Sequence, residues 1–193
     1  MKPADIFRKI NWKKFALGAL FLISLAPLLY LTGRFFVISI SRMGVFYELE
    51  FQEGDMALAC HRFLKGLPLY PDPEEGFVHL IYGPVVDVIT AFFMAVTGSK
   101  MLWVGRFVSF LFTLGTATVL FLWVRRETKS LAGAIVAPLL FLACYPISGY
   151  WYDIFRCDNC FMFFTILGCY LLTWKYEGRK EIAAGVLGAL AFT

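Results

Sequence analysis

The hydrophobic positions of this chain gather in long runs separated by short polar stretches. The runs cover residues 15–32, 84–98, 101–124, 131–149, 158–176 and 181–193. A helix that crosses a bilayer needs about 20 apolar residues, within a range of ~17–25. Four runs meet this length, whereas 84–98 is short and contains Asp87, and the last run reaches the chain end too soon. The pattern predicts an all-α, polytopic integral membrane bundle, a single domain over residues 1–193 with four crossing helices (15–32, 101–124, 131–149 and 158–176) and the start of a fifth at 181.

The composition supports a membrane protein. Hydrophobic residues make up 60% of the 193 positions and charged residues 17%, whereas soluble domains typically carry ~45–50% apolar and ~25% charged residues. The net charge is +4, but Lys and Arg lie in short clusters between apolar runs. This arrangement excludes nucleic acid as the expected partner and favours bilayer lipid. The first run exceeds the ~7–15 apolar residues of a signal peptide, so we expect it to remain as a membrane helix.

The basic clusters predict the orientation of the helices, because cytoplasmic loops carry an excess of Lys and Arg. If the run 84–98 lies at the membrane surface instead of crossing, three clusters share one side: the N-terminus, residues 125–129 and residues 175–180. That topology places 11 of the 18 Lys and Arg in the cytoplasm and 10 of the 14 acidic residues outside. The N-terminus is therefore predicted to be cytoplasmic, with external loops at about 34–100 and 150–158.

The long external loop is predicted to contain two helices of its own. In MALACHRFL (residues 56–64) apolar residues recur at i, i+3, i+4, i+7 and i+8, which is typical of an amphipathic helix, and Gly66 is a plausible stop. Residues 67–73 contain three prolines, which exclude a helix there. Pro84 suits the first turn of a further helix. We expect both helices, 55–65 and 84–98, to lie at the membrane interface beside an extended proline-rich segment.

Two acidic segments are candidates for chemistry, since both are predicted to be external and next to apolar helices. The first is ELEFQEGD (residues 48–55), and the second is Arg156-Cys157-Asp158. A positioned carboxylate can act as a general base, and Arg156 can bind a phosphate or keep Asp158 ionised. A plainer interpretation is that Asp55 and Asp158 are charges that favour helix N-termini, while Arg156 reaches to the membrane interface.

No metal or redox site is predicted from the cysteines and histidines. Cys157 and Cys160 have C-x-x-C spacing but lack a second pair of ligands. His61 and His79 are both on the predicted external side and can supply metal ligands with the nearby acids. A surface or phosphate-contacting histidine is the favoured interpretation of each.

Several segments together resemble one family. Glu53-Gly54-Asp55, LACHRFLKGLPLYPDP (residues 58–73) and Tyr82-Gly83-Pro84 resemble the first external loop of membrane-embedded C-type glycosyltransferases, and residues 105–164 are similar to the stretch that follows. The similarity covers about residues 49–193 and is greatest to bacterial protein O-mannosyltransferases and the lipid A aminoarabinose transferase. It implies a multi-helix fold, a polyprenyl-phosphate-linked sugar as donor, inversion at the anomeric carbon and, in some members, a divalent metal that helps to bind the lipid phosphate.

The resemblance also implies roles for particular residues. An acid of the family's first loop acts as general base, and the family commonly has adjacent Asp-Glu where this chain has Gln52-Glu53-Gly54-Asp55. Counting back from Gly66 matches Glu53 to the family's acid, whereas a gap of one residue matches Asp55 to it. Both are therefore candidates for the general base. Asp158 takes the place of the family's second acidic motif. The hypothesis names Glu53, Asp55 and Asp158 as catalytic, Arg156, Arg62, Lys65 and Tyr82 as substrate-binding, and no metal ligand.

These observations predict the N-terminal part of an inverting glycosyltransferase of a bacterial inner membrane, which transfers a sugar to a glycan, lipid or protein on the extracytoplasmic face. Family enzymes have more helices, and this chain ends within one, so we expect it to be inactive alone. One alternative is an inactive fragment or scaffold subunit. The other, a transporter, is disfavoured because the acids lie at one face and no inverted repeat is visible.

Overall fold

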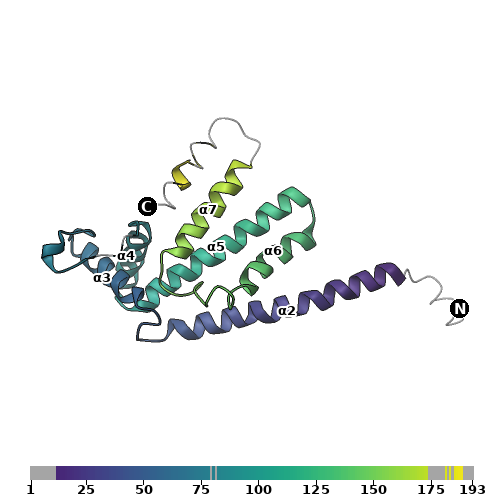
Figure 1. The fold of residues 1–193 in the computed structure, drawn as a ribbon, viewed down its shortest axis with the longest axis horizontal. Coiled ribbons are helices and arrows are strands. Elements are labelled where there is room, and N and C mark those ends of the chain that lie inside the picture. The colour runs from purple at the N-terminus through teal and green to yellow at the C-terminus, as the bar shows by residue number, and fades with distance from the viewer. Residues whose placement is uncertain are drawn as a thin grey trace, which may run out of the picture.

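The computed structural model describes residues 12–78, 80, 82–173, 181, 183 and 185–188, and every regular element in this part of the chain is a helix. In chain order the elements are α2 (Trp12–Met43), α3 (Gln52–Leu64), the short 3-10 helix η1 (Pro73–Glu75), α4 (Val85–Thr97), α5 (Leu102–Thr128), α6 (Leu131–Ala143) and α7 (Asp158–Leu172). Figure 1 shows α2, α5, α6 and α7 as a fan of long elements, with α3 and α4 at one end of it. The predicted all-helical class is confirmed for these residues.

Helix α5 lies at the centre of the molecule, in contact with α2, α3, α4, α6 and α7. Two glycines permit its close packing. A Cβ atom on Gly105 would lie 2.2 Å from ring atoms of Phe155, and one on Gly115 would lie 2.7 Å from the ring of Phe163. The absence of side chains at these two positions therefore lets α7 and the segment before it approach the α5 backbone.

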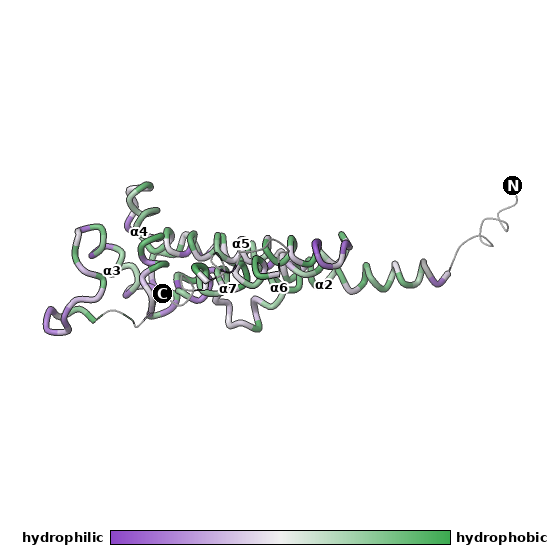
Figure 2. Tube along the Cα trace, turned by 90° about the horizontal axis from the view of Figure 1, so that it is seen from above, coloured by the Kyte–Doolittle hydropathy of each residue, from purple (hydrophilic) through white to green (hydrophobic). Residues whose placement is uncertain are grey.

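Helix α2 is longer than the predicted 15–32, because it begins at Trp12 and continues to Met43. The single charge of Arg34 does not end the helix, since the apolar sequence resumes at Phe35. In Figure 2 the N-terminal part of α2 extends beyond the other helices. Its apolar side chains are largely uncovered there, as at Ile23, which is 69% exposed. This is the exposure expected of a helix that faces lipid.

Two helices are long and apolar enough to cross a membrane, the 29 residues of α2 from Phe15 to Met43 and the 27 residues of α5. Helices α6 and α7 have 13 and 15 residues, fewer than the ~17–25 that a crossing helix needs. Two of the four predicted spans thus meet the length requirement in the described part of the chain. The four-helix topology and its orientation stay predictions.

Helix α6 ends at Ala143, short of the predicted end at residue 149. Pro146 explains this end, because a proline ring clashes with the carbonyl four residues earlier in a helix and disfavours helical geometry at the residue before it. Helix α7 begins at Asp158 as predicted and is helical to Leu172, whereas its predicted end at 176 lies outside the described residues. In the predicted fifth helix, the described residues 181, 183 and 185–188 are helical.

Helices α3 and α4 follow the turn signals of the sequence. Helix α3 starts at Gln52, three residues before the predicted 55, and stops at Leu64, followed by Gly66 in the left-handed conformation (φ 73°). The proline-rich segment is non-helical except for η1. Helix α4 follows directly on Pro84 and stops at Gly98 (φ 67°), close to the predicted 84–98. Their position at a membrane surface stays a prediction.

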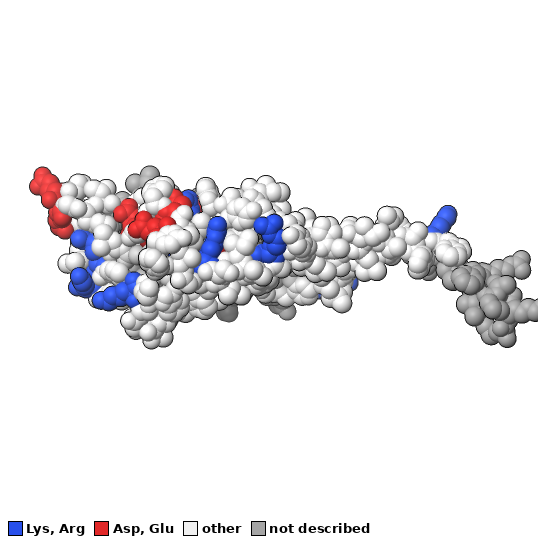
Figure 3. Space-filling view, turned by 90° about the horizontal axis from the view of Figure 1, so that it is seen from below, with Lys and Arg blue, Asp and Glu red and all other residues white. Residues whose placement is uncertain are grey.

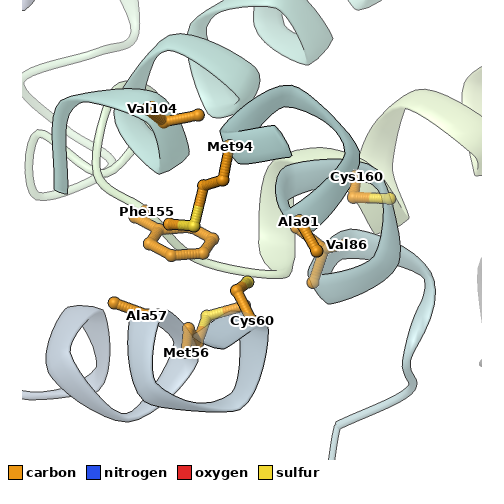
Figure 4. Close-up of a cluster of buried hydrophobic side chains, with 9 residues drawn as sticks. All are labelled: Met56, Ala57, Cys60, Val86, Ala91, Met94, Val104, Phe155 and Cys160. Atoms are coloured by element: carbon orange, nitrogen blue, oxygen red, sulfur yellow. The ribbon is translucent and has the colours of Figure 1, made fainter. Parts of the chain in front are cut away.

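A buried apolar cluster joins α3 and α4 to α5 and α7. Met56 and Cys60 of α3 pack with Val86, Ala91 and Met94 of α4 in this cluster, which also contains Ala57, Val104, Phe155 and Cys160 (Figure 4). Of the predicted apolar face of α3, Met56, Ala59 and Cys60 are buried, whereas Phe63 and Leu64 are exposed. The cluster holds the start of α3 beside the segment that leads into α7, and both candidate acidic motifs lie in these two places.

Candidate active site

Acidic side chains gather at the end of the molecule that carries α3 and α4, as the view in Figure 3 shows. Two arginine–carboxylate groups of very different character lie there. We call Glu53 and Arg106 the closed pair, and Glu50, Arg156 and Asp158 the open cluster. The two are neighbours, because Glu50 and Glu53 are only three residues apart at the start of α3.

The closed pair leaves the Glu53 carboxylate no free acceptor position. Arg106 donates from Nε to Oε1 (2.8 Å) and from Nη2 to Oε2 (2.6 Å). The backbone amide of Phe155 donates to Oε1 (3.1 Å), and that of Leu49 donates to Oε2 (2.7 Å). A carboxylate has about four lone-pair sites, and all four are occupied. Both side chains of the pair are 0% exposed.

Arg106 is equally saturated. Besides its two bonds to Glu53, it donates from Nη1 to the carbonyls of Arg42 (2.8 Å) and Val45 (2.6 Å), and from Nη2 to the carbonyl of Tyr47 (2.7 Å). A guanidinium carries five N–H donors, and each of them is used. The pair thereby fastens the end of α2, the loop after it, α3, α5 and the segment before α7 to one another.

Asp55 differs sharply from Glu53, although only Gly54 separates them in the sequence. Its residue is partly exposed, and its side chain makes no ion pair or hydrogen bond within the part of the chain that the structure describes. Residues three apart on a helix are neighbours, so Asp55 lies on the same side of α3 as Gln52. Its position in the first turn also complements the helix dipole.

Arg156 in the open cluster is shared by two carboxylates. Its Nε donates to Oδ2 of Asp158 (2.7 Å), its Nη1 lies 3.3 Å from Oε1 of Glu50, and its guanidinium lies 4.3 Å from the ring centre of Trp151. Burial acts to lower the pKa of Arg156, but the hydrogen bond and charge of Asp158 and the charge of Glu50 outweigh it, so the pKa is raised. The Asp158 side chain is 47% exposed, whereas those of Glu50 and Arg156 are 16% and 9% exposed, so the cluster opens to solvent through Asp158. Its formal charge is −1.

Gln52 and Tyr82 link the open cluster to the loop before α4. Gln52 donates from Nε2 to the Tyr82 hydroxyl (3.0 Å), and its backbone amide donates to Oε2 of Glu50 (2.9 Å). The Tyr82 carbonyl accepts a hydrogen bond from the Tyr70 hydroxyl, which ties the proline-rich segment to the same loop. Five of the predicted site residues therefore lie around the start of α3: Glu53, Asp55, Tyr82, Arg156 and Asp158.

Arg62 and Lys65, the other predicted substrate-binding residues, lie at the far end of α3. Ten residues separate Arg62 from Gln52, which corresponds to about 15 Å along a helix. Arg62 is 3.4 Å from the Glu75 carboxylate and lies over the ring of Phe77 (4.7 Å), so it holds the proline-rich segment against α3. Lys65 is exposed. The structure does not bring these two cations to the acidic site.

A third set of polar side chains is connected to the closed pair through Arg42, whose carbonyl accepts a hydrogen bond from Arg106. Arg42 donates from Nη1 to the Tyr145 hydroxyl (3.1 Å), to the Tyr150 carbonyl (2.9 Å) and to Oδ1 of Asp153 (3.3 Å). The Tyr145 hydroxyl donates to the same Asp153 oxygen (2.5 Å), while Oδ2 of Asp153 is buried without a hydrogen-bond partner. Burial raises the pKa of Asp153. This group braces the segment before α7 against the end of α2.

The described residues contain no group of three or more His, Cys, Asp or Glu side chains that could hold a metal ion. Burial raises the pKa of Cys60, and burial with the Asp158 charge raises that of Cys157 to about 11, which keeps both thiols protonated near neutral pH. His61 shares a hydrogen bond with the Lys100 carbonyl (3.0 Å). His79 lies outside the described residues.

The sequence did not predict that Arg106, Gln52 and Asp153 form the buried polar contacts described above. Arg106 had a detectable signal, because it is a lone charge near the start of an apolar helix, and such charges mark pairing or function. Gln52 and Asp153 had none, because an uncharged amide or a single loop acid becomes notable only through its burial and its neighbours.

The comparisons with known proteins identify the family. The family model described as dolichyl-phosphate-mannose-protein mannosyltransferase matches residues 82–193, more than half of the chain. No curated protein and no solved structure gives a significant match. The matched region contains α4 to α7, with Arg106, Arg156 and Asp158, and it supports the predicted glycosyltransferase resemblance without distinguishing the bacterial or lipid A subgroups. The chain belongs to the dolichyl-phosphate-mannose-protein mannosyltransferase family.

Proposed function

We propose that this chain forms the part of an inverting membrane glycosyltransferase that holds the reactive end of a polyprenyl-phosphate-linked sugar, with Asp55 as the base for the acceptor. Family membership supports a polyprenyl-phosphate sugar donor and a membrane setting. The predicted topology supports transfer to a glycan, lipid or protein acceptor on the extracytoplasmic face of a cell membrane, with the N-terminus in the cytoplasm.

The observation that carries this proposal is the contrast between Glu53 and Asp55. Glu53 is fully buried and all four of its lone-pair sites accept hydrogen bonds, so it has no position from which to take a proton. Asp55 is partly exposed and unpaired among the described residues. A general base must come within hydrogen-bond reach of the proton that it removes, and of these two acids only Asp55 meets this condition. Glu53 then acts as a positioning residue.

The proposed reaction is a single displacement. As the acceptor hydroxyl oxygen bonds to the anomeric carbon, its proton passes to the Asp55 carboxylate. The bond between that carbon and the phosphate oxygen breaks, and its electron pair stays on the lipid phosphate. The attacking and leaving oxygens lie on opposite faces of the carbon, which gives inversion.

Arg156 is the proposed partner of the leaving phosphate. A guanidinium can bind a phosphate through two parallel hydrogen bonds. Asp158 orients Arg156 through the 2.7 Å bond to Nε, whereas Glu50 contacts Nη1 at the longer distance of 3.3 Å. Donor binding therefore replaces the Glu50 contact with a phosphate contact, while Asp158 keeps its place.

The test compares Asp55→Asn with Glu53→Gln in the protein encoded by the complete reading frame. Transfer of mannose from a synthetic polyprenyl-phosphate-mannose is measured together with donor binding and thermal stability. We expect Asp55→Asn to lower the transfer rate by about 10²–10⁴-fold, with donor binding and stability retained. Glu53→Gln should instead lower stability. Glu74→Gln, at an exposed acid of η1, is the matched control and should change neither.

A transfer rate of Asp55→Asn within twofold of the wild type would refute Asp55 as the base. If Asp158→Asn and Arg156→Met also left the rate unchanged, the alternative of a non-catalytic membrane subunit would replace the enzyme.

A further inference from the structure

Gln52 has a buried polar end with no partner. The residue is 7% exposed, its Nε2 donates to the Tyr82 hydroxyl (3.0 Å), and its Oε1 is buried without a hydrogen bond. Reversing the amide would exchange the two atoms, but one end would contact Tyr82 and the other would still lack a partner. Buried polar groups are hydrogen-bonded in the great majority of cases. An unpaired amide between charged residues thus indicates a group that binds there.

The position of Gln52 limits what that group can be. Its backbone amide contacts Oε2 of Glu50 (2.9 Å), and Oε1 of the same carboxylate lies 3.3 Å from Arg156. On the other side, Asp55 is three residues later and therefore adjacent on the helix surface. Gln52 is thus a neighbour of the proposed base on α3 and is linked through Glu50 to the proposed phosphate-binding cation.

In an inverting displacement the sugar ring is the part of the substrate between these two groups. The base contacts the acceptor oxygen on one face of the anomeric carbon, and the cation contacts the phosphate on the other. A sugar hydroxyl can both donate and accept a hydrogen bond, so it satisfies either end of the amide. A phosphate oxygen can only accept, and the Arg156 guanidinium is the better partner for it.

We propose that Gln52, held by the Tyr82 hydroxyl, binds a ring hydroxyl of the donor sugar and thereby selects sugar-bearing over sugar-free polyprenyl phosphate. This rests on the proposed function of the same site. Tyr82 is partly exposed and belongs to the loop before α4, so the Gln52 amide lies directly beside a side chain that solvent reaches. Sites built to hydrogen-bond a hydroxyl reject ligands that lack it, because buried polar groups are then left unpaired.

The experiment measures binding of two synthetic ligands to the full-length protein: a polyprenyl phosphate, and the same lipid phosphate carrying mannose. We expect Gln52→Met to weaken binding of the mannosyl lipid by about 10–100-fold and to leave binding of the sugar-free lipid unchanged. Arg156→Met should weaken both. A series of monodeoxy-mannosyl lipids then identifies the hydroxyl. The analogue that lacks this hydroxyl should bind the wild type more weakly than the mannosyl lipid does. Gln52→Met should bind that analogue and the mannosyl lipid equally well.

Tyr82→Phe is the second variant and keeps the test decisive if Gln52→Met fails to fold. It removes the hydroxyl that holds the amide and should produce the same selective loss in smaller degree. Equal loss of both ligands, or unchanged preference in both variants, would overturn the assignment of Gln52. That result would leave the proposed function intact if Asp55→Asn still abolished transfer. Wild-type protein that bound neither ligand would refute the proposed function, and the assignment of Gln52 with it.

Discussion

The closed pair and the open cluster are both made of arginine and carboxylate side chains, but they are suited to opposite tasks. Arg106 and Glu53 use all five donors and all four acceptor sites on protein groups and are 0% exposed. Arg156 is shared by Glu50 and by Asp158, whose side chain is 47% exposed. A saturated pair can only hold segments together, whereas a cluster with excess carboxylate that opens to solvent at Asp158 can exchange one partner for a ligand. Charge and burial alone do not identify a reactive acid; the free lone pair does.

The largest effect should come from breaking the closed pair. Arg106→Met leaves the Glu53 charge buried without its partner, which typically costs about 3–5 kcal/mol of stability. We expect a marked fall in the thermal denaturation midpoint in detergent and little folded protein at growth temperature. The double variant Arg106→Met with Glu53→Leu should recover part of that loss, because no unpaired charge remains. A single variant as stable as the wild type would show that the pair does not hold the site together.

A smaller effect should follow from crowding the contact beside the pair. A Cβ on Gly105 would lie 2.2 Å from the Phe155 ring, and the Phe155 amide donates to Glu53. Overpacking of this kind costs about 1–3 kcal/mol, so Gly105→Ala should lower the denaturation midpoint and the transfer rate together. Gly18→Ala is the control, because a Cβ there meets nothing within 4 Å. Equal behaviour of the two variants would mean that the contact is easily relaxed.

Changing the open cluster should alter binding rather than stability. Glu50→Gln removes one competitor for Arg156; the two side chains are 16% and 9% exposed, and ion pairs near the protein surface are worth about 0.2–1 kcal/mol. Affinity for sugar-free polyprenyl phosphate should therefore rise by about 1.4-fold to fivefold, with an unchanged denaturation midpoint. Glu48→Gln, two residues earlier, is the matched control. A weaker affinity in Glu50→Gln would show that Glu50 supports the ligand instead of competing with it.

The smallest effect concerns Asp153, which is intermediate between the two groups because one oxygen is bonded and the other is not. Burial raises its pKa in the folded protein above the ordinary value of 3.8. The folded state then holds the proton more tightly than the unfolded state, so stability falls as the pH rises from that value through the raised pKa. Comparison of denaturation midpoints across this range should show a shallower fall in Asp153→Asn. An identical slope in both proteins would contradict the raised pKa.

The sequence alone determined the helical class, the helix stops close to Gly66 and Gly98, and the presence of two acidic segments, because these depend on apolar run length and on residues that stop helices locally. Only the tertiary structure decided that α2 continues past Arg34, that Arg106 closes on Glu53 from 53 residues away, and that Gln52 keeps an unpaired amide. The choice between Glu53 and Asp55 could not be made from the sequence for the same reason. Two acids separated by one residue on a helix point to different sides, and which side becomes buried depends on the packing of α3 against α5 and the segment before α7.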